Sequence, residues 1–479
     1  MFAALRAALL GSAIFLAAVP LHAQQNNLPE LGDPTVAVMS ADQEHRLGRA
    51  WLRSLRGQAP ILDDPLIQEY TESLVYRLAS FSELNQPNLA IVVINTPDIN
   101  AFAVPGGVIG LNAGLFLHAT SDDEVASVVA HEIAHVSQRH FARRFMDAKK
   151  MNIGVLAAML ASIAVAIAGD AQAGMAGMAA TQAGALQAQL AYSRSNEREA
   201  DRVGMRTLAA AGLDPAAMPR FFERMLEQQR YSGNPPEFLL THPVTEDRVA
   251  DTRARARTLP HPDTHPSAHF LLARARVQTR YFETIERART YFTGRLESGN
   301  ASRRQAARYG LALTELRARH YDKALSLMET LARHHPDQLW YNLGMMEINL
   351  AKGDYPAVIS GGERVLRINP RDYSATILLS RAYLLNKKPG QAVPLLEPLL
   401  LGRPSDPRLW SLAADAWGNS GDRARAHRGR AEVLFLHGQD RQAFQQMRYA
   451  LEEAKGQFAL HSQLSARRDE MERLGKEEF

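Results

Sequence analysis

Hydrophobic and polar positions in the first half of the chain form a pattern that mixes strands with helices. Residues 91–94 are a β-branched run bounded by turn formers, which predicts a buried strand. Residues 101–109 predict two short strands joined at Gly106 and Gly107. Because these strands lie among helical segments over residues 24–257, this part of the chain is expected to be an α+β domain.

The pattern after residue 267 is helical and repetitive. Pro336, Pro370 and Pro404 follow one another at intervals of 34 residues, which is the period of the tetratricopeptide repeat. We therefore expect stacked helix pairs that form a binding groove, with a weaker unit near Gly438 and a polar terminal helix as a cap. The alternative is an unrelated helical bundle with accidental spacing. Other residues recur near the same interval: Gly310 and Gly344, Tyr321 and Tyr355, and Ala324, Ala357, Ala392 and Ala426.

Composition marks the boundaries between these parts. Residues 1–23 place a basic residue before an apolar stretch and a small residue at the expected cut, which predicts a secretory signal peptide. The alternative is an uncleaved anchor helix, although the apolar core is shorter than the ~20 residues that a span needs. Residues 259–267 hold three prolines, as is typical of a linker. We expect a signal peptide at 1–23, an α+β domain at 24–258, a linker and helical connection at 259–304, and repeats at 305–479.

Composition also excludes several classes of function. Hydrophobic residues make up 46% of the 479 residues, enough for sizeable cores, which excludes a disordered or fibrous chain. The net charge of +4 is spread along the chain and does not form the basic field that nucleic-acid binding requires. The chain has no cysteine, which excludes thiol nucleophiles, thiolate metal sites, disulfides and lipid anchors on cysteine.

The strongest chemical signal is the motif His131-Glu132-x-x-His135. Upstream, Ser121 and Glu124 have the spacing of a capping box, so we expect a helix to begin there. On that helix the two histidines lie one turn apart on one face, close enough to bind one tetrahedral zinc ion. Glu132 can then act as general base. The alternative is a pair of surface histidines, but the helix is apolar before the motif, and burying these groups would need a partner such as a metal.

A zinc site of this type needs a third protein ligand and an open fourth position. The best candidate is a charged segment in which a helix start places Glu197 and Asp201 on one face and Glu199 elsewhere. Glu197 can then bind the metal, and Asp201 can hydrogen-bond a ligating imidazole. The alternative is a charged, solvated helix start. His140 follows His135 by five residues, so on a regular helix it would lie off the face that carries His131 and His135. It is expected to be an ordinary surface histidine.

A long apolar segment separates these two groups of candidate ligands. Between Met151 and Arg194 the only charged residue is Asp170. Alanine-rich composition and scattered polar residues bring the expected free energy of membrane insertion close to zero. We interpret the segment as a helical hairpin near the active site or at a membrane surface. A lid over the site and plain core helices are the alternatives.

The order of the motifs is informative in itself. The segments are Asn100-Ala101-Phe102 with Pro105-Gly106-Gly107, then His131-Glu132-x-x-His135, then Glu197-x-x-x-Asp201. This series resembles the zinc metallopeptidase family of the CAAX prenyl proteases and HtpX. The added signal peptide and repeat tail resemble the periplasmic members of that family in Gram-negative bacteria, which act in β-barrel assembly. The resemblance covers nearly all of the chain after the signal peptide.

The resemblance implies an α+β zincin-type metallopeptidase domain followed by an all-α tetratricopeptide-repeat solenoid. It implies that His131, His135 and Glu197 bind one Zn²⁺ per chain, with Glu132 as the catalytic base. Thr241-His242-Pro243 also recurs in the family. His242 is therefore a candidate fourth ligand or oxyanion donor, and the alternative is a loop histidine before a proline.

The function implied by the resemblance is that of a periplasmic zinc-dependent endopeptidase with chaperone-like client binding. Its partners would be unfolded or unassembled outer-membrane proteins and the outer-membrane assembly machinery, with a peripheral membrane contact and no nucleic acid. An extended substrate is expected along the edge strand near residues 101–104, where backbone pairing tolerates many sequences. Two alternatives remain open: a chaperone or adaptor with a mainly structural or regulatory zinc site, and an integral membrane protease.

Overall fold

The computed structural model describes residues 39–84, 88–147, 193–232, 235–260, 262 and 265–476. The predicted signal peptide and most of the apolar segment, residues 151–192, lie outside this part of the chain. Among the helices within it, none is both long and apolar enough to cross a membrane.

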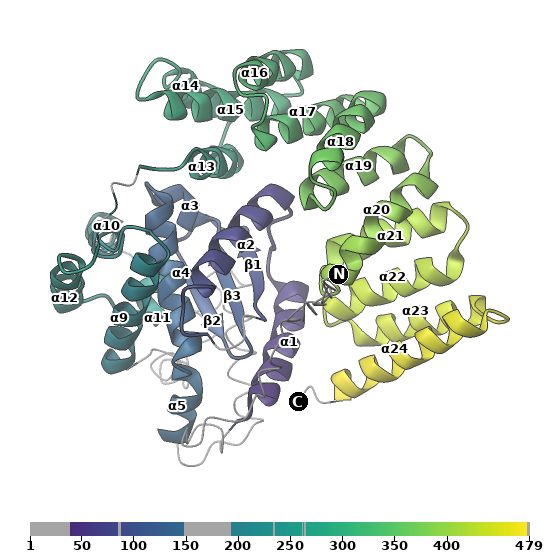
Figure 1. Ribbon diagram of the computed structural model, residues 1–479, viewed down its shortest axis with the longest axis horizontal. Helices are drawn as coiled ribbons and strands as arrows, with labels where there is room; N and C mark the ends of the chain where they lie inside the picture. The colour runs from purple at the N-terminus through teal and green to yellow at the C-terminus, as the bar shows by residue number, and fades with distance from the viewer. Residues whose placement is uncertain are drawn as a thin grey trace, which may run out of the picture.

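A three-stranded sheet lies within the N-terminal half (Figure 1). β1 (Ala90–Ile94), β2 (Ala101–Val104) and β3 (Val108–Asn112) are arranged in the order β1-β3-β2, so β2 is an edge strand. β1 runs parallel to β3, and β2 runs antiparallel to it. Gly106 and Gly107 turn the β2–β3 hairpin with φ of 78° and 73°, a left-handed conformation that favours glycine. The predicted strand and the predicted hairpin are both confirmed.

Helix α4 (Asp122–Ser137) is the buried centre of this half, because almost all of its residues are inaccessible to solvent. It packs against β2, α2 (Pro65–Ala79) and α9 (Arg194–Ala210). Its approach to α9 depends on Gly204, where a Cβ atom would lie 3.1 Å from the backbone of Ala130. The remaining helices of this half are α1 (Ala41–Gln58), α3 (Gly114–His118), α5 (His140–Asp147), α10 (Ala217–Ser232), α11 (Glu237–Thr241) and α12 (Glu246–Ala256).

The start of α4 differs in one detail from the predicted capping box. Ser121 caps the helix as expected, since its Oγ accepts a hydrogen bond from the Glu124 amide at 3.3 Å. The Glu124 carboxylate, however, accepts from the amide of Thr120 at 2.7 Å and pairs with Arg224 of α10. The reciprocal half of the predicted box is therefore wrong, because a distant helix supplies the partner that draws this carboxylate away.

The C-terminal half is an arc of paired helices (Figure 1). Pro336, Pro370 and Pro404 each stand three residues before the first helix of a pair, so the predicted period is confirmed as a structural repeat. The last helix buries Leu464 and Met471 against the helix before it, as expected of a cap. The pairs are α15 (Ala301–Arg317) with α16 (Tyr321–His334), α17 (Leu339–Lys352) with α18 (Tyr355–Ile368), α19 (Tyr373–Leu385) with α20 (Pro389–Gly402), α21 (Pro407–Asn419) with α22 (Arg423–Leu436), and α23 (Asp440–Glu453) with α24 (Phe458–Lys476).

The connection between the halves, residues 259–304, is mostly helical. It contains α13 (Ala268–Tyr281) and α14 (Ile285–Thr293), and α15 already begins at Ala301. α13 packs on α3 of the first half and on α15 of the repeats. The connection therefore adds to the packed structure on both sides, and the exact domain boundaries stay a prediction.

The arc curls back so that its later repeats meet the N-terminal half: α19 lies against α2, and α22 lies against α1 (Figure 1). Arg276 of α13 is buried and donates hydrogen bonds to Asp64 of the first half and to Glu347 of α17. The rings of Tyr70 and Trp340 meet edge to face with centroids 6.4 Å apart. The two halves share a hydrophobic core, which fixes their relative orientation.

Candidate metal centre

Three helices bring four of the predicted residues to one place. His131 and His135 lie one turn apart on the buried middle of α4. Glu197 is in the first turn of α9, which packs across α4. His242 directly follows α11. All four side chains are buried, so their polar atoms face one another rather than solvent.

The spacing of these side chains fits a tetrahedral ion. Their potential ligand atoms all lie within 4.8 Å of one another. His131 Nε2 is 3.0 Å from His135 Nε2 and 3.3 Å from His242 Nδ1. Glu197 Oε1 is 3.4 Å from His135 Nε2 and 3.1 Å from His242 Nδ1. Ligand atoms about 2.0–2.2 Å from a tetrahedral zinc ion would be about 3.3–3.6 Å apart, close to the observed distances.

The chemistry of these donors also fits a metal. A neutral imidazole offers one N–H and one lone pair, so three converging ring nitrogens and a carboxylate cannot all satisfy one another by hydrogen bonds. A divalent cation accepts all of these lone pairs at once. The residues present therefore fit a metal ion at this position.

Glu132 is buried beside this centre, and neither of its carboxylate oxygens has a hydrogen-bond partner among the described residues. His242 Nε2 lies 3.5 Å from Glu132 Oε1. Burial raises the pKa of Glu132. A buried carboxylate without a hydrogen-bond partner is costly and is characteristic of functional sites. Its position suits a general base that exchanges a proton with reacting water.

Asp201 lies one turn after Glu197 on α9 and supports the centre from outside the ligand set. Its Oδ1 is 3.0 Å from Nδ1 of His131. Arg248 of α12 donates to both Asp201 oxygens at 2.8 and 2.7 Å and lies 2.7 Å from Glu197 Oε2. These contacts orient the His131 ring so that Nε2 faces the other donors. Sequence reasoning missed Arg248, whose only signal is its spacing of six residues after His242.

Burial and neighbouring charges shift the pKa values of these groups in opposite directions. Burial lowers the pKa of His131, but its contacts with Asp201 and Glu197 outweigh burial and raise the pKa to about 9. Burial lowers the pKa of His135. Burial also disfavours the ionised form of Glu197, yet the neighbouring His242 and the other two imidazoles hold its pKa well below the usual range. The carboxylate is thus kept ionised, which is the form in which carboxylates bind metals.

The prediction that His140 is an ordinary surface histidine is wrong. α4 ends at Ser137, and Arg139 adopts a left-handed φ of 49°, which redirects the chain before α5 begins at His140. The His140 ring is buried, with Nδ1 2.9 Å from Nδ1 of His135 and Nε2 3.2 Å from the Glu199 carboxylate. A regular helix continued through residue 140 would turn this side chain away from the metal centre, but the break at Arg139 turns it toward His135.

Comparison with known proteins agrees with this geometry. Residues 65–256 match the profile of peptidase family M48, and residues 349–416 match a tetratricopeptide-repeat profile. The chain is 34% identical over 457 residues to the β-barrel assembly-enhancing protease of Yersinia pestis, covering 94% of this chain and 93% of the relative. The chain belongs to peptidase family M48. The β-barrel assembly-enhancing protease of Escherichia coli strain K12 is 35% identical over 451 residues, covering 94% and 92%.

A more distant similarity is restricted to the peptidase half. The mitochondrial metalloendopeptidase OMA1 of Arabidopsis thaliana is 32% identical over 189 residues, covering 39% of this chain and 36% of the relative. The resemblance inferred from the motifs is therefore confirmed, as are the metallopeptidase class and the fold of an α+β peptidase domain followed by a repeat solenoid. The alternative of an unrelated helical bundle is wrong. Peptidases of family M48 depend on a metal ion, in agreement with the donor set found here.

Proposed function

We propose that this chain is an endopeptidase that binds one Zn²⁺ through His131, His135 and Glu197 and uses Glu132 as its general base. The observation that supports this most directly is the convergence of the ligand atoms beside a buried carboxylate that has no hydrogen-bond partner in the described chain. Nitrogen and carboxylate donors at this spacing suit zinc, which takes two histidines and a glutamate in peptidases of this type.

The reaction would be divided between the metal and Glu132. A bound zinc ion would supply Lewis acidity to water and to the scissile carbonyl. Glu132 would accept a proton from the attacking water and deliver it to the leaving amine. Since the Glu132 carboxylate accepts no hydrogen bond from the described residues, it remains available for this transfer. Asp201 and Arg248 would keep the His131 ring in position throughout.

His242 would act as the fourth group of the centre. Its Nδ1 lies 3.3 Å from Nε2 of His131 and 3.1 Å from Oε1 of Glu197, while Nε2 of His135 lies 3.0 and 3.4 Å from the same two atoms. These similar distances suit a ligand in the resting enzyme. Its ring stacks on the buried Phe238 with centroids 4.7 Å apart, which holds it in place. When a substrate displaces it, the ring could donate a hydrogen bond to the developing oxyanion.

The substrate would lie along β2, the edge strand nearest the general base. α4 packs on β2, and the backbone of Ala103 lies beside the Glu132 carboxylate. An extended peptide that pairs with this edge would bring its own backbone to Glu132 whatever its side chains are. The arrangement therefore supports an endopeptidase with broad sequence tolerance.

The relatives are named for enhancing β-barrel assembly. We infer that this chain acts in the periplasm, after removal of residues 1–23, on unfolded or unassembled outer-membrane proteins and together with their assembly machinery. Residues 24–258 would cleave such clients. The repeats of residues 305–479 would bind them in a chaperone-like manner, and residues 259–304 would join the two parts.

A Glu132→Gln variant tests the proposal. Zinc is measured by elemental analysis of protein never exposed to chelator, and cleavage of a denatured outer-membrane β-barrel protein is followed over time. We expect equimolar zinc in parent and variant, with cleavage reduced about 10²–10⁴-fold in the variant. Glu227→Gln, which changes an exposed glutamate of α10, is the matched control and should cleave normally.

Two results would count against the proposal in different ways. Normal cleavage by the Glu132→Gln variant would refute the role of Glu132 as base. A parent protein without stoichiometric zinc would refute the metal site. A variant that cannot cleave but still supports envelope integrity in cells would favour an adaptor whose zinc is structural.

A further inference from the structure

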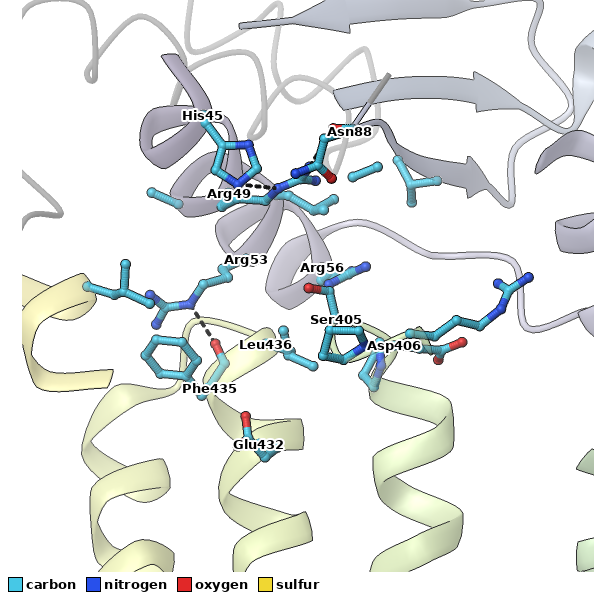
Figure 2. Close-up of a pocket in the computed structure, with 18 of the residues that line it drawn as sticks. His45, Arg49, Arg53, Arg56, Asn88, Ser405, Asp406, Glu432, Phe435 and Leu436 are labelled. Carbon is cyan, nitrogen blue, oxygen red and sulfur yellow. Dashed lines mark hydrogen bonds between the residues drawn. The ribbon is translucent and has the colours of Figure 1, made fainter. Parts of the chain in front are cut away.

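A large cavity lies between the two halves of the chain. Its volume is about 1620 Å³. Its walls come from α1, α2 and β1 of the peptidase half and, on the side of the repeats, from the segment that begins α21 and from the later parts of α22 and α24 (Figure 2). None of the residues of the metal centre lines it. Small-molecule pockets usually measure ~300–1,000 Å³, so this cavity is large enough for a segment of polypeptide.

The walls carry an excess of positive charge, with nine arginines and five carboxylates. Arg53 and Arg408 pair with carboxylates outside the walls, Asp440 and Asp63. The five carboxylates of the walls already pair with other groups and form no ion pair with the remaining arginines, although Asp406 attracts Arg56 and Glu432 attracts Arg428 at longer range. Asp42 pairs with Arg46, Glu72 with Arg403, and Glu432 and Glu470 with Arg467, while Asp406 caps α21 and accepts the Tyr373 hydroxyl.

Among the remaining arginines, Arg56 and Arg428 form no hydrogen bond or ion pair in the described chain. Arg56 of α1 makes neither a hydrogen bond nor an ion pair there, and Figure 2 shows it across from the segment that begins α21. Arg428 of α22 makes no ion pair there either, and its buried Nε lacks a hydrogen-bond partner. Burial lowers the pKa of both guanidinium groups, that of Arg56 to about 10. The attraction of Asp406 to Arg56 and of Glu432 to Arg428 does not outweigh burial, because both pKa values remain lowered, so an anionic ligand would be stabilised here.

Arg49 adds a third positive charge to the same wall. It precedes Arg56 by about two turns of α1 and donates a hydrogen bond to the carbonyl of Asn88 (Figure 2). It has no carboxylate partner in the described chain. Its neighbour His45 also lines the cavity. Burial lowers the pKa of Arg49 as well. The unpaired charges therefore extend along α1, which suits a ligand with several carboxylates better than a single small anion.

Aromatic rings lie among these arginines. The guanidinium carbon of Arg428 is 5.3 Å from the ring centroid of Trp410, and that of Arg53 is 3.6 Å from the centroid of Phe435. An acyl chain would need a continuous apolar wall, which these guanidinium groups interrupt. A polypeptide with both acidic and apolar side chains matches this alternation of charge and ring.

The wall formed by β1 does not favour strand addition. The carbonyls of Leu89 and Ile91 already accept hydrogen bonds from Tyr76 and Gln68. A ligand in the cavity would therefore be recognised through its side chains, in contrast to the backbone pairing proposed at β2.

We propose that this cavity binds an acidic, extended segment of a polypeptide client, with Arg56 and Arg428 as the residues that bind its carboxylates. Planar guanidinium groups pair with carboxylates in a bidentate manner, which gives both affinity and orientation. The site lies outside the metal centre, so the segment that it holds need not be the segment that is cleaved. It would select clients by charge, which the edge of β2 does not do.

Fluorescence anisotropy of the full chain carrying Glu132→Gln measures this binding without loss of the ligand to cleavage. The probe is a short labelled peptide of glutamate, serine and leucine, and the comparison peptide replaces each glutamate with glutamine. We expect the acidic peptide to bind more tightly and to weaken as salt is added. Arg56→Gln together with Arg428→Gln should weaken its binding about tenfold to a hundredfold. Arg371→Gln, an exposed arginine between α18 and α19, is the matched control and should change nothing.

Several results would overturn the proposal. These are equal affinity for the acidic and glutamine peptides, unchanged affinity in the double variant, and arginine-dependent binding of phosphatidylglycerol vesicles without binding of the peptide. Thermal unfolding separates a lost site from a lost fold. Removing two desolvated charges should leave the midpoint unchanged or raise it, and a lowered midpoint would assign the arginines a structural role instead. Because every measurement uses a cleavage-deficient chain, the outcome does not depend on the proposed peptidase mechanism.

Discussion

The guanidinium group of Arg248 donates hydrogen bonds to both carboxylate oxygens of Asp201, at 2.8 and 2.7 Å. The pair is buried, and Asp201 also lies 3.0 Å from Nδ1 of His131. Removing either member would leave the other charge buried and uncompensated. The orientation of a candidate metal ligand on α4 is therefore tied to α12, which is far away in the sequence.

Asp201→Asn keeps the shape of the side chain but removes the negative charge between Arg248 and His131. We expect zinc affinity to fall about 10–100-fold, because the imidazole loses the acceptor that fixes its tautomer and orientation. Competition with a chromogenic chelator measures this affinity. Asp251→Asn on α12 is the control, since within the described chain Asp251 pairs with the exposed Arg255 and not with the metal centre. Equal affinities of the Asp201 variant and the parent would show that the contact does not position the ring.

His140→Phe keeps a buried ring but cannot hydrogen-bond to Nδ1 of His135. In the parent, a proton on His135 Nδ1 can be donated to His140, which leaves Nε2 of His135 free for the metal. We therefore expect the phenylalanine variant to bind zinc about tenfold more weakly, as measured by chelator competition. Glu199→Gln should have a smaller effect, because Glu199 contacts His140 and not the ligand itself. If the phenylalanine variant bound zinc with the affinity of the parent, His140 would contribute packing and would not position His135.

Gly106→Ala should destabilise the β2–β3 hairpin. Gly106 has φ of 78°, and a Cβ atom there would collide with the backbone carbonyl of Glu44. We expect the free energy of unfolding in urea to fall by about 1–3 kcal/mol. Gly390→Ala in α20 is the matched control, because a Cβ atom there meets nothing within 4 Å, and it should stabilise by about 0.4–1 kcal/mol. A turn that tolerates alanine as well as α20 does would contradict the strain argument.

Sequence reasoning identified the part of the site that follows one regular helix. The helical period alone places His131 and His135 on one face, and the structure keeps them there. The period fails at His140, because the chain turns at Arg139. That left-handed residue is held by tertiary contacts, since Arg139 donates to the carbonyl of Met39 and pairs with Glu44. No local pattern encodes contacts of this kind.

The same limit applies to the relation between the two halves. The proline period predicted the helix pairs, because each pair is a local unit. The contact of α22 with α1 results from the curvature of the whole arc, which accumulates over several repeats. Arg53, for example, donates to the carbonyl of Phe435, 382 residues away in the sequence. Motifs and periodicity in the sequence therefore could not predict the cavity between the halves.

Glu315 gives the repeat half a part of its stability that depends on pH. Its carboxylate accepts hydrogen bonds from Arg289 and His320, each at 2.7 Å. The hydrogen bond from Arg289 is the main reason that the pKa of Glu315 falls from 4.5 to about 2. A carboxylate whose pKa is lower in the folded state than in the unfolded state stabilises the fold above the unfolded value and loses that contribution as the pH falls through the folded value.

Glu315→Gln should therefore be less stable than the parent at neutral pH, and the difference should shrink as the pH falls from 4.5 toward about 2. Urea unfolding at a series of pH values measures it, with Glu297→Gln as a control at an exposed position. A difference that stays constant over this range would mean that the shape of the side chain matters and its charge does not. A difference that vanishes at low pH would instead show that the ionised carboxylate, held by Arg289 and His320, joins α14 to the end of α15.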